Sequence, residues 1–344
     1  MNVFTSYLEK LGSNFIVSSM VPSLALVIVS LIVFDPTLIS LSAFQDFEDT
    51  PRLIVLGVFV VVLAVIIGFT LTALNTFILK MFEGYIKPFP VRIAYILSHR
   101  KHQNRARTLS DQRDLLKSQI YELKKRVGND PVRKAELDGL MERHYKAAAE
   151  YGLTYPEDIS DVMPSRFGNI LKAAENYPGE RYGFDGVQFW PRLVHVIPAD
   201  YKANIDNTRN ELSFLANMSI LSAVFSFLSI AAVFFSMAAV TGAGTDPKIY
   251  YKFLEAGGKY ILFAGFGFAF SYFFYNASIL SVGSFGLIIR SSFDLFRLEL
   301  LKEFDLERPK DSVEEFETWN NLNELIVLGS HSLKYTKLDY RERE

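Results

Sequence analysis

The sequence predicts an all-α membrane protein with four transmembrane helices in two hairpins and a cytosolic helical domain. Half of the 344 residues are hydrophobic, and the charged residues are unevenly distributed. Four stretches contain no Asp, Glu, Lys or Arg: 11–34, 53–79, 212–245 and 260–289. They are 24, 27, 34 and 30 residues long, and each exceeds the roughly 20 apolar residues with which a helix crosses a bilayer core. A single soluble domain is therefore excluded.

The uncharged stretches divide the chain into four parts. We expect a first transmembrane hairpin over 11–79, a cytosolic helical insert over 80–211, a second transmembrane hairpin over 212–289 and cytosolic C-terminal helices over 290–344. The first stretch is longer than the hydrophobic region of a signal peptide, which spans about 7–15 residues. We therefore expect it to stay in the protein as an anchor.

The charges that flank the uncharged stretches predict the orientation. The link 35–52 carries four acidic residues and one basic residue, whereas 80–107 carries seven Lys and Arg against one Glu. Because basic residues are enriched on the cytoplasmic side of a membrane, 80–107 is expected inside the cell, together with both termini.

The insert is expected to begin with a helical hairpin. Apolar residues recur at helical spacing from Leu116 to Val127, and Asp130 followed by Pro131 is typical of the start of a second helix. Two helices joined so closely should pack antiparallel. Ser165 is expected to cap a further helix, and the Pro and Gly residues of 176–198 predict an irregular lobe after it.

The fourth transmembrane helix is expected to continue beyond the membrane. Apolar residues keep helical spacing from Phe293 to Phe304, and Pro309 should end the helix. Ser312 with Glu315 has the spacing of a capping box, which predicts a last helix starting there.

No motif of an enzyme or a cofactor site is present. The chain has no cysteine, which excludes disulfides and thiolate ligands, and it lacks nucleotide-binding and metalloprotease motifs. His99 and His102 have helical spacing, but their neighbours Arg100 and Lys101 would repel a metal ion. We therefore expect no metal, no cofactor and no enzymatic activity.

The segment 80–126 has a formal charge of +8 and is the strongest candidate for ligand binding. Its residues nearest the bilayer are explained by topology and by anionic lipid headgroups. The later residues would lie beyond a Debye length from the membrane, so a nucleotide or oligonucleotide is an alternative to simple solvation. The arginines of 164–193 alternate with acidic and aromatic residues, which fits either a structural network or an anion pocket. The candidate ligand-binding residues are Arg113, Lys117, Lys124, Lys125, Arg126, Arg166, Arg181 and Arg192.

The uncharged stretches carry hydroxyl and amide side chains but no acidic or basic ones. Small polar residues allow close helix packing, and they can also line a water-filled path. The absence of an intramembrane charge argues against a proton-coupled carrier or a pump. The candidate pore-lining residues are Ser271, Ser278, Ser281, Asn75 and Asn217.

Five short segments carry a resemblance to known proteins. They are EGY (83–85), PSRFGN (164–169), AAENYP (173–178), ERYGFD (180–185) and FWPRL (189–193). In this order they resemble a family of largely uncharacterised bacterial four-span membrane proteins, some of which look like channel-forming effectors of antiviral defence. The resemblance implies location in the bacterial inner membrane and supplies no catalytic residue.

We therefore expect a homo-oligomeric channel or pore that a cytosolic nucleotide or oligonucleotide gates, with membrane lipid as its other partner. Two hairpins alone do not readily enclose a water path, which is why an oligomer is expected. The first alternative is a membrane-anchored scaffold that binds a cytosolic partner. The second is a membrane enzyme, for which the sequence offers no nucleophile.

Overall fold

A computed structural model describes residues 15–34, 49–86, 92–128, 130–241, 249–329 and 338. Within these ranges every regular element is a helix, in agreement with the all-α prediction. The predicted positions of the termini, and most of the link 35–52 on which the orientation rests, lie outside the described residues.

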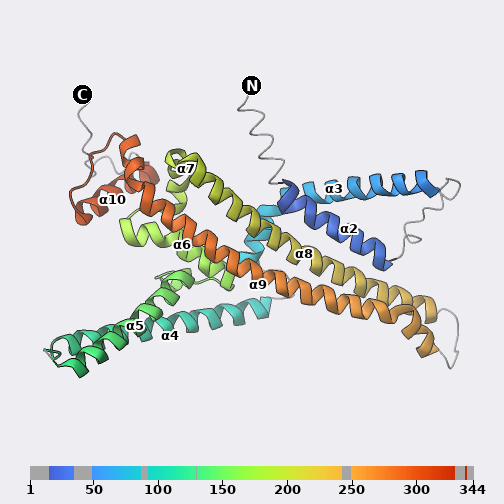
Figure 1. The fold of residues 1–344 in the computed structure, drawn as a ribbon, viewed down its shortest axis with the longest axis horizontal. Helices are drawn as coiled ribbons and strands as arrows, with labels where there is room; N and C mark the ends of the chain where they lie inside the picture. Colours follow the sequence, from blue (N-terminus) through green and yellow to red (C-terminus); the bar gives the residue numbers. More distant parts are fainter. Residues whose placement is uncertain are drawn as a thin grey trace. The chain divides into compact units, whose positions relative to one another are not determined.

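Figure 1 shows the order of the helices along the chain. The elements are η1 (Ile16–Met20), α2 (Val21–Phe34), α3 (Asp49–Glu83), α4 (Arg92–Lys124), α5 (Pro131–Thr154), η3 (Ile159–Asp161), α6 (Arg166–Tyr182), α7 (Gly186–Val196), α8 (Ala199–Thr241), α9 (Ile249–Glu303) and α10 (Ser312–Leu328). Four helical segments among the described residues are long and apolar enough to cross a membrane: Ile16–Phe34, Ile54–Glu83, Ala199–Ala238 and Gly257–Glu303. Each of them overlaps one of the four uncharged stretches.

The chain divides into two compact units. Unit 1 consists of Met1–Leu79 and Arg209–Ser281, and unit 2 of Lys80–Thr208 and Val282–Glu344. Helices α3, α8 and α9 contribute residues to both units.

Unit 1 contains few buried apolar side chains and many exposed ones. A small buried cluster joins Val33, Phe225 and Tyr260, whereas Ile32, Phe235 and Leu280 are 76%, 77% and 75% exposed. Large exposed apolar surfaces of this kind mark contact with a membrane or another protein rather than with water. The surface of unit 1 therefore fits its candidate spans.

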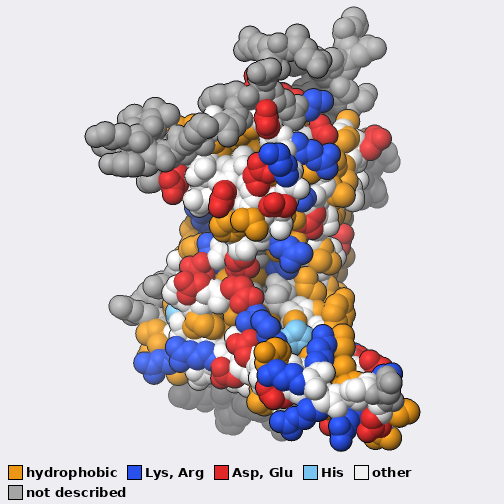
Figure 2. Space-filling view, turned by 90° about the vertical axis from the view of Figure 1, so that its left-hand side faces the viewer, with side chains coloured by type: hydrophobic (Ala, Val, Ile, Leu, Met, Phe, Trp, Pro, Cys, Tyr) orange, Lys and Arg blue, Asp and Glu red, His pale blue; other side chains and the backbone are white. Residues whose placement is uncertain are grey.

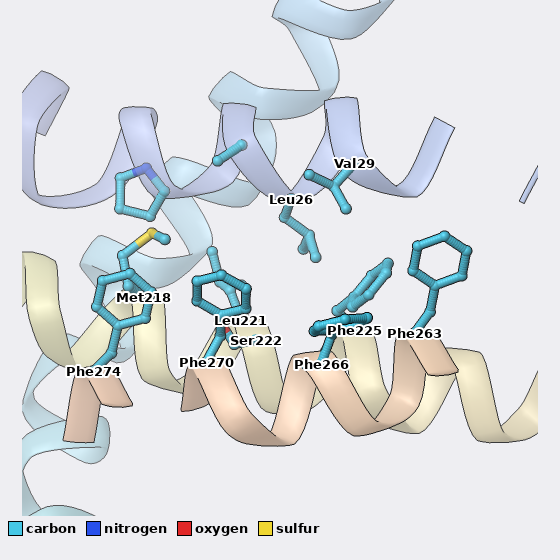
Figure 3. Close-up of a pocket in the computed structure, with 13 residues that line it drawn as sticks. Leu26, Val29, Met218, Leu221, Ser222, Phe225, Phe263, Phe266, Phe270 and Phe274 are labelled. Carbon is cyan, nitrogen blue, oxygen red and sulfur yellow. The ribbon is translucent and has the colours of Figure 1, made fainter. Parts of the chain in front are cut away.

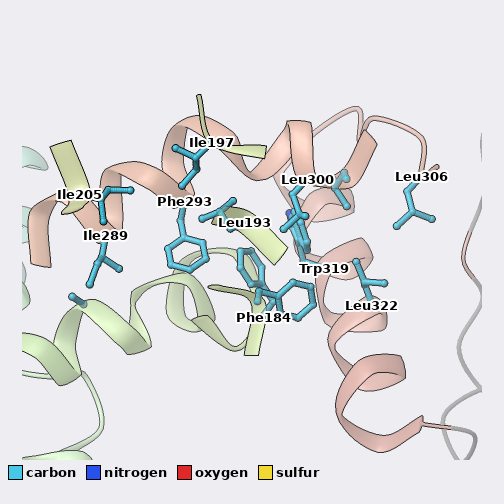
Figure 4. Close-up of a cluster of buried hydrophobic side chains, with 13 residues drawn as sticks. Phe184, Leu193, Ile197, Ile205, Ile289, Phe293, Leu300, Leu306, Trp319 and Leu322 are labelled. Atoms are coloured by element: carbon cyan, nitrogen blue, oxygen red, sulfur yellow. The ribbon is translucent and has the colours of Figure 1, made fainter. Parts of the chain in front are cut away.

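Unit 2 has a continuous hydrophobic core built by α7, α9 and α10 (Figure 4). Trp319 of α10 is fully buried against Phe184, at 4.3 Å between ring centroids, and Phe184 also contacts Phe293 of α9. Pairs of aromatic rings at such distances add to the stabilisation from area burial. The predicted continuation of the fourth span is confirmed, because α9 runs without a break to Glu303 and delivers Phe293 to this core.

The predicted hairpin at the start of the insert is confirmed. Helices α4 and α5 lie side by side (Figure 1), and Ala106, Leu109 and Tyr151 form the buried seam between them. The Asp130 side chain accepts a hydrogen bond from the backbone N–H of Val132, as an N-cap does.

The prediction of an irregular lobe over 176–198 is wrong. Helix α6 continues through Pro178 to Tyr182, and α7 occupies Gly186–Val196 with Pro191 inside it. Gly183 ends α6 in the left-handed region, at φ +90°, and Asp185 caps α7. The glycines thus separate two helices, and packing of the buried Pro178 offsets the cost of about 3 kcal/mol for proline within a helix.

The predicted cap of the last helix is wrong by one residue. Asp311, not Ser312, is the N-cap, and it accepts hydrogen bonds from the backbone N–H groups of Val313 and Glu314. Asp and Ser are almost equally good N-caps, so their adjacency left the register open. Glu315 instead pairs with Arg297 of α9, at 2.7 Å.

Candidate functional site

The helix that opens unit 1 begins with a π-helical turn, η1, surrounded by polar side chains. The Thr72 hydroxyl of α3 donates to Ser19 Oγ at 3.1 Å, and Asn217 Nδ2 of α8 donates to the carbonyl of Ser18 at 2.7 Å. Ser23 Oγ donates to the carbonyl of Ser19 at 2.7 Å. A π-helical turn shifts the helical hydrogen-bond pattern and is frequent at functional sites. Three candidate spans thus converge through polar groups at η1.

Gly68 permits the close approach of α3 to η1. A Cβ atom at Gly68 would lie 3.1 Å from the Phe15 ring and 3.4 Å from the backbone of Met20. Thr72 is one turn further along α3, and Asn75 follows it at the next position of the same face. The side of α3 that meets η1 is therefore lined with small and polar residues.

Several polar atoms buried in unit 1 have no hydrogen-bond partner in the part of the chain that the structure describes. They are Asn75 Oδ1, Asn217 Oδ1, Ser229 Oγ and Ser281 Oγ. Asn217 is only 1% exposed, and Ser281 only 3%. A buried polar atom without a partner costs about 1–3 kcal/mol, which a water molecule or another polar group can offset. Because the chain itself encloses these atoms, only a small polar group such as a water molecule would fit beside them as a partner.

The predicted pore-lining residues differ in whether they form hydrogen bonds within the chain. Asn75, Asn217 and Ser281 carry the unpartnered atoms just described. Ser271 and Ser278 are engaged within the chain: the carbonyl of Ser271 accepts from Ser219 Oγ at 2.9 Å, and Ser278 Oγ donates to the carbonyl of Tyr275 at 2.7 Å. The three serines share one face of α9, and that face packs against α8 at Ser219. Their pore-lining role stays a prediction.

The predicted ligand-binding residues of α4 differ in how far they are engaged. Arg113 contacts Glu157 at 2.6 Å and lies 4.9 Å from the centroid of the Tyr151 ring. Burial alone would lower the pKa of Arg113, but the hydrogen bond and charge of Glu157 raise it above its ordinary value. Arg113 is therefore a structural clamp between α4 and the segment after α5.

Towards its C-terminal end, α4 presents a more open basic surface. Asp114, Lys117, Tyr121 and Lys124 line an open concavity of about 450 Å³, so one carboxylate accompanies the two ammonium groups. The Lys125 ammonium lies 3.9 Å from the centroid of the Tyr121 ring. Arg126 is exposed and reaches Glu122 at 3.7 Å. Figure 2 shows acidic side chains among the basic ones over the whole of this view. The local surface combines cations with a ring that could stack on a base.

The arginines of the second half of the insert do not come together. Arg166, Arg181 and Arg192 are all exposed, and Arg192 donates to the carbonyl of Gln188 in its own helix. The buried positions of the same segments belong to aromatic and small residues such as Phe167 and Phe189. The structure therefore forms no convergent arginine pocket from these three residues.

A polar cluster that the sequence did not reveal lies around Asp294 of α9. Tyr177 donates to Asp294 Oδ1 at 2.9 Å, and Tyr182 donates to the same atom at 2.6 Å. Arg297 donates to the Asp294 carbonyl and lies 4.3 Å from the Tyr182 ring centroid, while Arg290 lies 5.3 Å from that of Tyr177. Burial, followed by the hydrogen bond to Asp294, raises the pKa of both tyrosines. The cluster fixes α6 to α9.

Two of the segments that carry the family resemblance, 83–85 and 164–169, contact each other in unit 2. Ser165 Oγ donates to the carbonyl of Glu83 at 2.9 Å, and Gly168 approaches that carbonyl so closely that a Cβ atom would lie 2.1 Å from it. Gly84, at φ +91°, turns the chain against Pro164. These segments are therefore explained by the junction between the end of α3 and the start of α6.

The histidines of α4 do not form a metal site, and no cluster of metal-ligating side chains occurs among the described residues. His99 Nε2 lies 2.8 Å from the carbonyl of Val162, and His102 Nδ1 lies 3.1 Å from the Tyr155 hydroxyl. Burial, with the charges of Lys101 and Arg166, lowers the pKa of His102. Both histidines support the packing of α4 on the segment that follows α5.

Comparison with known proteins identifies no relative. No protein-family model, no curated protein and no solved structure matches this chain.

Proposed function

We propose that the chain is an oligomeric ion channel or pore of the bacterial inner membrane, with both termini in the cytoplasm, that opens when a cytosolic nucleotide or oligonucleotide binds. A role as an effector of antiviral defence belongs to the same proposal. The observation that carries it is the set of buried, unpartnered polar atoms in the candidate spans: Asn75 Oδ1, Asn217 Oδ1, Ser229 Oγ and Ser281 Oγ.

A water path that reaches these atoms in the open channel would supply their missing partners. In a hydrocarbon environment a polar atom without a partner is unfavourable, and irregular or polar groups are tolerated where they face a water-filled cavity. Neighbouring copies of the chain would complete the path, because the described part of each copy supplies four candidate spans, too few to enclose a path readily.

The chemistry of the spans favours passive conduction. None of the four uncharged stretches contains Asp, Glu, Lys, Arg or His, whereas pumps and proton-coupled carriers generally use such a residue within the membrane. Hydroxyl and amide groups suffice to hydrate a permeating ion.

Gating is proposed to start at the open end of α4 and to act through α9. Lys117 and Lys124 would bind phosphate groups, and Tyr121 between them would stack on a base. Helix α9 carries both the candidate span with Ser281 and the Asp294 cluster of unit 2, so a change at that cluster can bias the span.

Current recordings in planar bilayers test the proposal. Purified protein should give unitary current steps that change when nucleotides or short single-stranded oligonucleotides are added on the cytosolic side. Asn217→Leu should lower the unitary conductance, because it removes a hydrating amide. The matched control is Asn276→Leu, which removes an amide that is exposed on α9 and bonded to its own helix.

Ligand binding is tested separately from conduction. The double substitution Lys117→Gln and Lys124→Gln should weaken the response to ligand and leave the unitary conductance unchanged. Lys134→Gln removes an exposed charge from the same hairpin and should leave both unchanged. A silent bilayer from folded, oligomeric protein under every ligand would overturn the channel proposal.

One observation favours a scaffold as the second candidate. The α4–α5 hairpin exposes the large apolar side chains of Leu115, Val132 and Tyr145, which are 59%, 76% and 75% accessible. Such side chains on a projecting hairpin fit the binding of a cytosolic partner. A scaffold predicts silent bilayers and normal behaviour after Ser281→Leu.

A further inference from the structure

Unit 1 contains an apolar cavity between α2, α8 and α9 (Figure 3). Its volume is about 360 Å³. Leu26 and Val29 line it from α2, Met218 and Phe225 from α8, and Phe266 and Phe270 from α9. The volume falls within the range of about 300–1,000 Å³ that is usual for small-molecule sites.

The lining defines the chemistry of a ligand. No charged residue lines the cavity, and Ser222 is the single polar side chain among the described lining residues. A ligand with a charge or several hydrogen-bonding groups would lose its hydration without compensation there. This lining therefore suits a hydrocarbon group.

The cavity opens on a surface that is itself apolar. Val29, Phe266 and Phe270 belong to both the lining and the surface, being 43%, 60% and 54% exposed. All three helices contain candidate spans, so in a bilayer this opening would face the acyl chains. An empty cavity would deprive its lining of dispersion contacts, which an entering acyl chain restores.

We propose that this cavity is a binding site for an acyl chain of a membrane phospholipid. A chain of methylene groups is narrow and flexible, whereas a helix of a second copy, about 10–12 Å across with its side chains, is too wide to enter. The inference goes beyond the proposed channel, because it requires only that α2, α8 and α9 lie in a bilayer.

The test counts phospholipid that stays with the purified full-length protein in mild detergent, by native mass spectrometry and by extraction of phosphorus-containing lipid. Ala25→Phe adds a ring inside the cavity, and Ala269→Phe makes the same change at an exposed position of α9 outside the lining. Wild type and Ala269→Phe should retain phospholipid, and Ala25→Phe should retain about tenfold less. Val29→Trp, at the rim, provides a second filling variant.

Folding and oligomeric state are measured in parallel by circular dichroism and light scattering. Equal phospholipid retention by wild type and the folded filling variants would overturn the proposal. A filling variant that dissociates the oligomer but retains as much phospholipid as wild type would also overturn it. In that case the cavity holds side chains of a second copy in place of lipid. Retention of free fatty acid in place of phospholipid would also overturn it. No current is recorded, so the result is independent of channel activity.

Discussion

The two units differ in the number of hydrogen bonds that each provides to a buried asparagine. Asn169 of unit 2 is fully buried and makes three hydrogen bonds: Oδ1 accepts from the Met163 backbone N–H, and Nδ2 donates to the carbonyls of Met163 and Ser165. Asn217 of unit 1 is equally buried, but within the described part of the chain its Nδ2 has one partner and its Oδ1 has none. The amide group of the same residue type is thus fully hydrogen-bonded in unit 2 and only partly hydrogen-bonded in unit 1.

The contrast extends beyond this pair. Of the five buried side-chain atoms without a partner among the described residues, four lie in unit 1, and the fifth is Trp319 Nε1 of unit 2. Among the described residues the buried cluster of unit 2 around Trp319 is larger than that of unit 1 around Phe225, although both units expose large apolar side chains. Unit 2 therefore provides partners within the chain for more of its buried polar atoms, whereas those of unit 1 need water or another polar group.

The largest expected effect is the loss of the core of unit 2 on Trp319→Ala. This side chain is fully buried among Phe184 and Phe189, so its removal should lower the free energy of unfolding by about 3–5 kcal/mol. Chemical denaturation in detergent, followed by circular dichroism, measures the change. Val313→Ala, at an exposed position of the same helix, should change stability by less than about 0.5 kcal/mol. Equal effects would show that α10 does not depend on this core.

The second prediction compares the two asparagines directly. Asn169→Ala leaves the N–H and the carbonyl of Met163 without their partner, whereas the Ser165 carbonyl still accepts from the backbone N–H of residue 169, and the substitution should cost about 2–4 kcal/mol. Asn217→Ala removes a single hydrogen bond and an already unpartnered oxygen, and should cost about 1 kcal/mol or less. Chemical denaturation of both variants gives the comparison. An equal or larger loss for Asn217→Ala would break the contrast between the units.

The third prediction concerns the junction of the two motif segments. Gly168→Ala places a Cβ atom 2.1 Å from the Glu83 carbonyl, so the end of α3 must shift away from α6 at a cost of about 1–3 kcal/mol. Gly139→Ala, in the open on α5, should instead stabilise the protein by about 0.5–1 kcal/mol. Thermal unfolding of the matched pair shows whether close approach or helix propensity governs each site. A stabilising Gly168→Ala would contradict the described junction.

The sequence contains the information for elements that depend on local chemistry. The uncharged stretches predicted the four candidate spans, and Asp130 and Ser165 were identified as caps because an N-cap bonds only two or three residues ahead. The Asp294 cluster was missed because Tyr177 lies 117 residues away along the chain. The Pro and Gly residues of 176–198 were misread, because tertiary packing outweighs the local preference against helix.

The candidate sites were predictable only in part. Residue type and helical spacing placed polar groups in the spans, but could not tell that Ser278 bonds to its own helix while Ser281 lacks a partner. The alternating arginines of the insert suggested a pocket, yet the helices turn Arg166, Arg181 and Arg192 outward. Exposure depends on which face of a helix its neighbours cover, and one sequence does not specify that.

The smallest expected effect is a change in the pH dependence of unit 2. Burial, followed by the hydrogen bond to Asp294, raises the pKa of Tyr182 above the value of about 10 for an unfolded chain. Below pH 10 the tyrosine is protonated in both states, and its contribution to stability is fully present. Above pH 10 the unfolded chain loses this proton while the folded chain keeps it, so stability falls as pH rises towards the folded pKa.

Tyr182→Phe should therefore flatten the loss of stability above pH 10, although it lowers stability at neutral pH by removing a hydrogen bond to Asp294. Unfolding followed by tryptophan fluorescence reports on unit 2 alone, because Trp190 and Trp319 are the only tryptophans and both belong to it. Tyr201→Phe is the control, since that hydroxyl lies 3.5 Å from a backbone carbonyl and contacts no carboxylate. If all three proteins lose stability with the same slope above pH 10, the Asp294 cluster does not hold the tyrosine proton, and the contrast between the hydrogen bonding of unit 2 and that of unit 1 loses one of its supports.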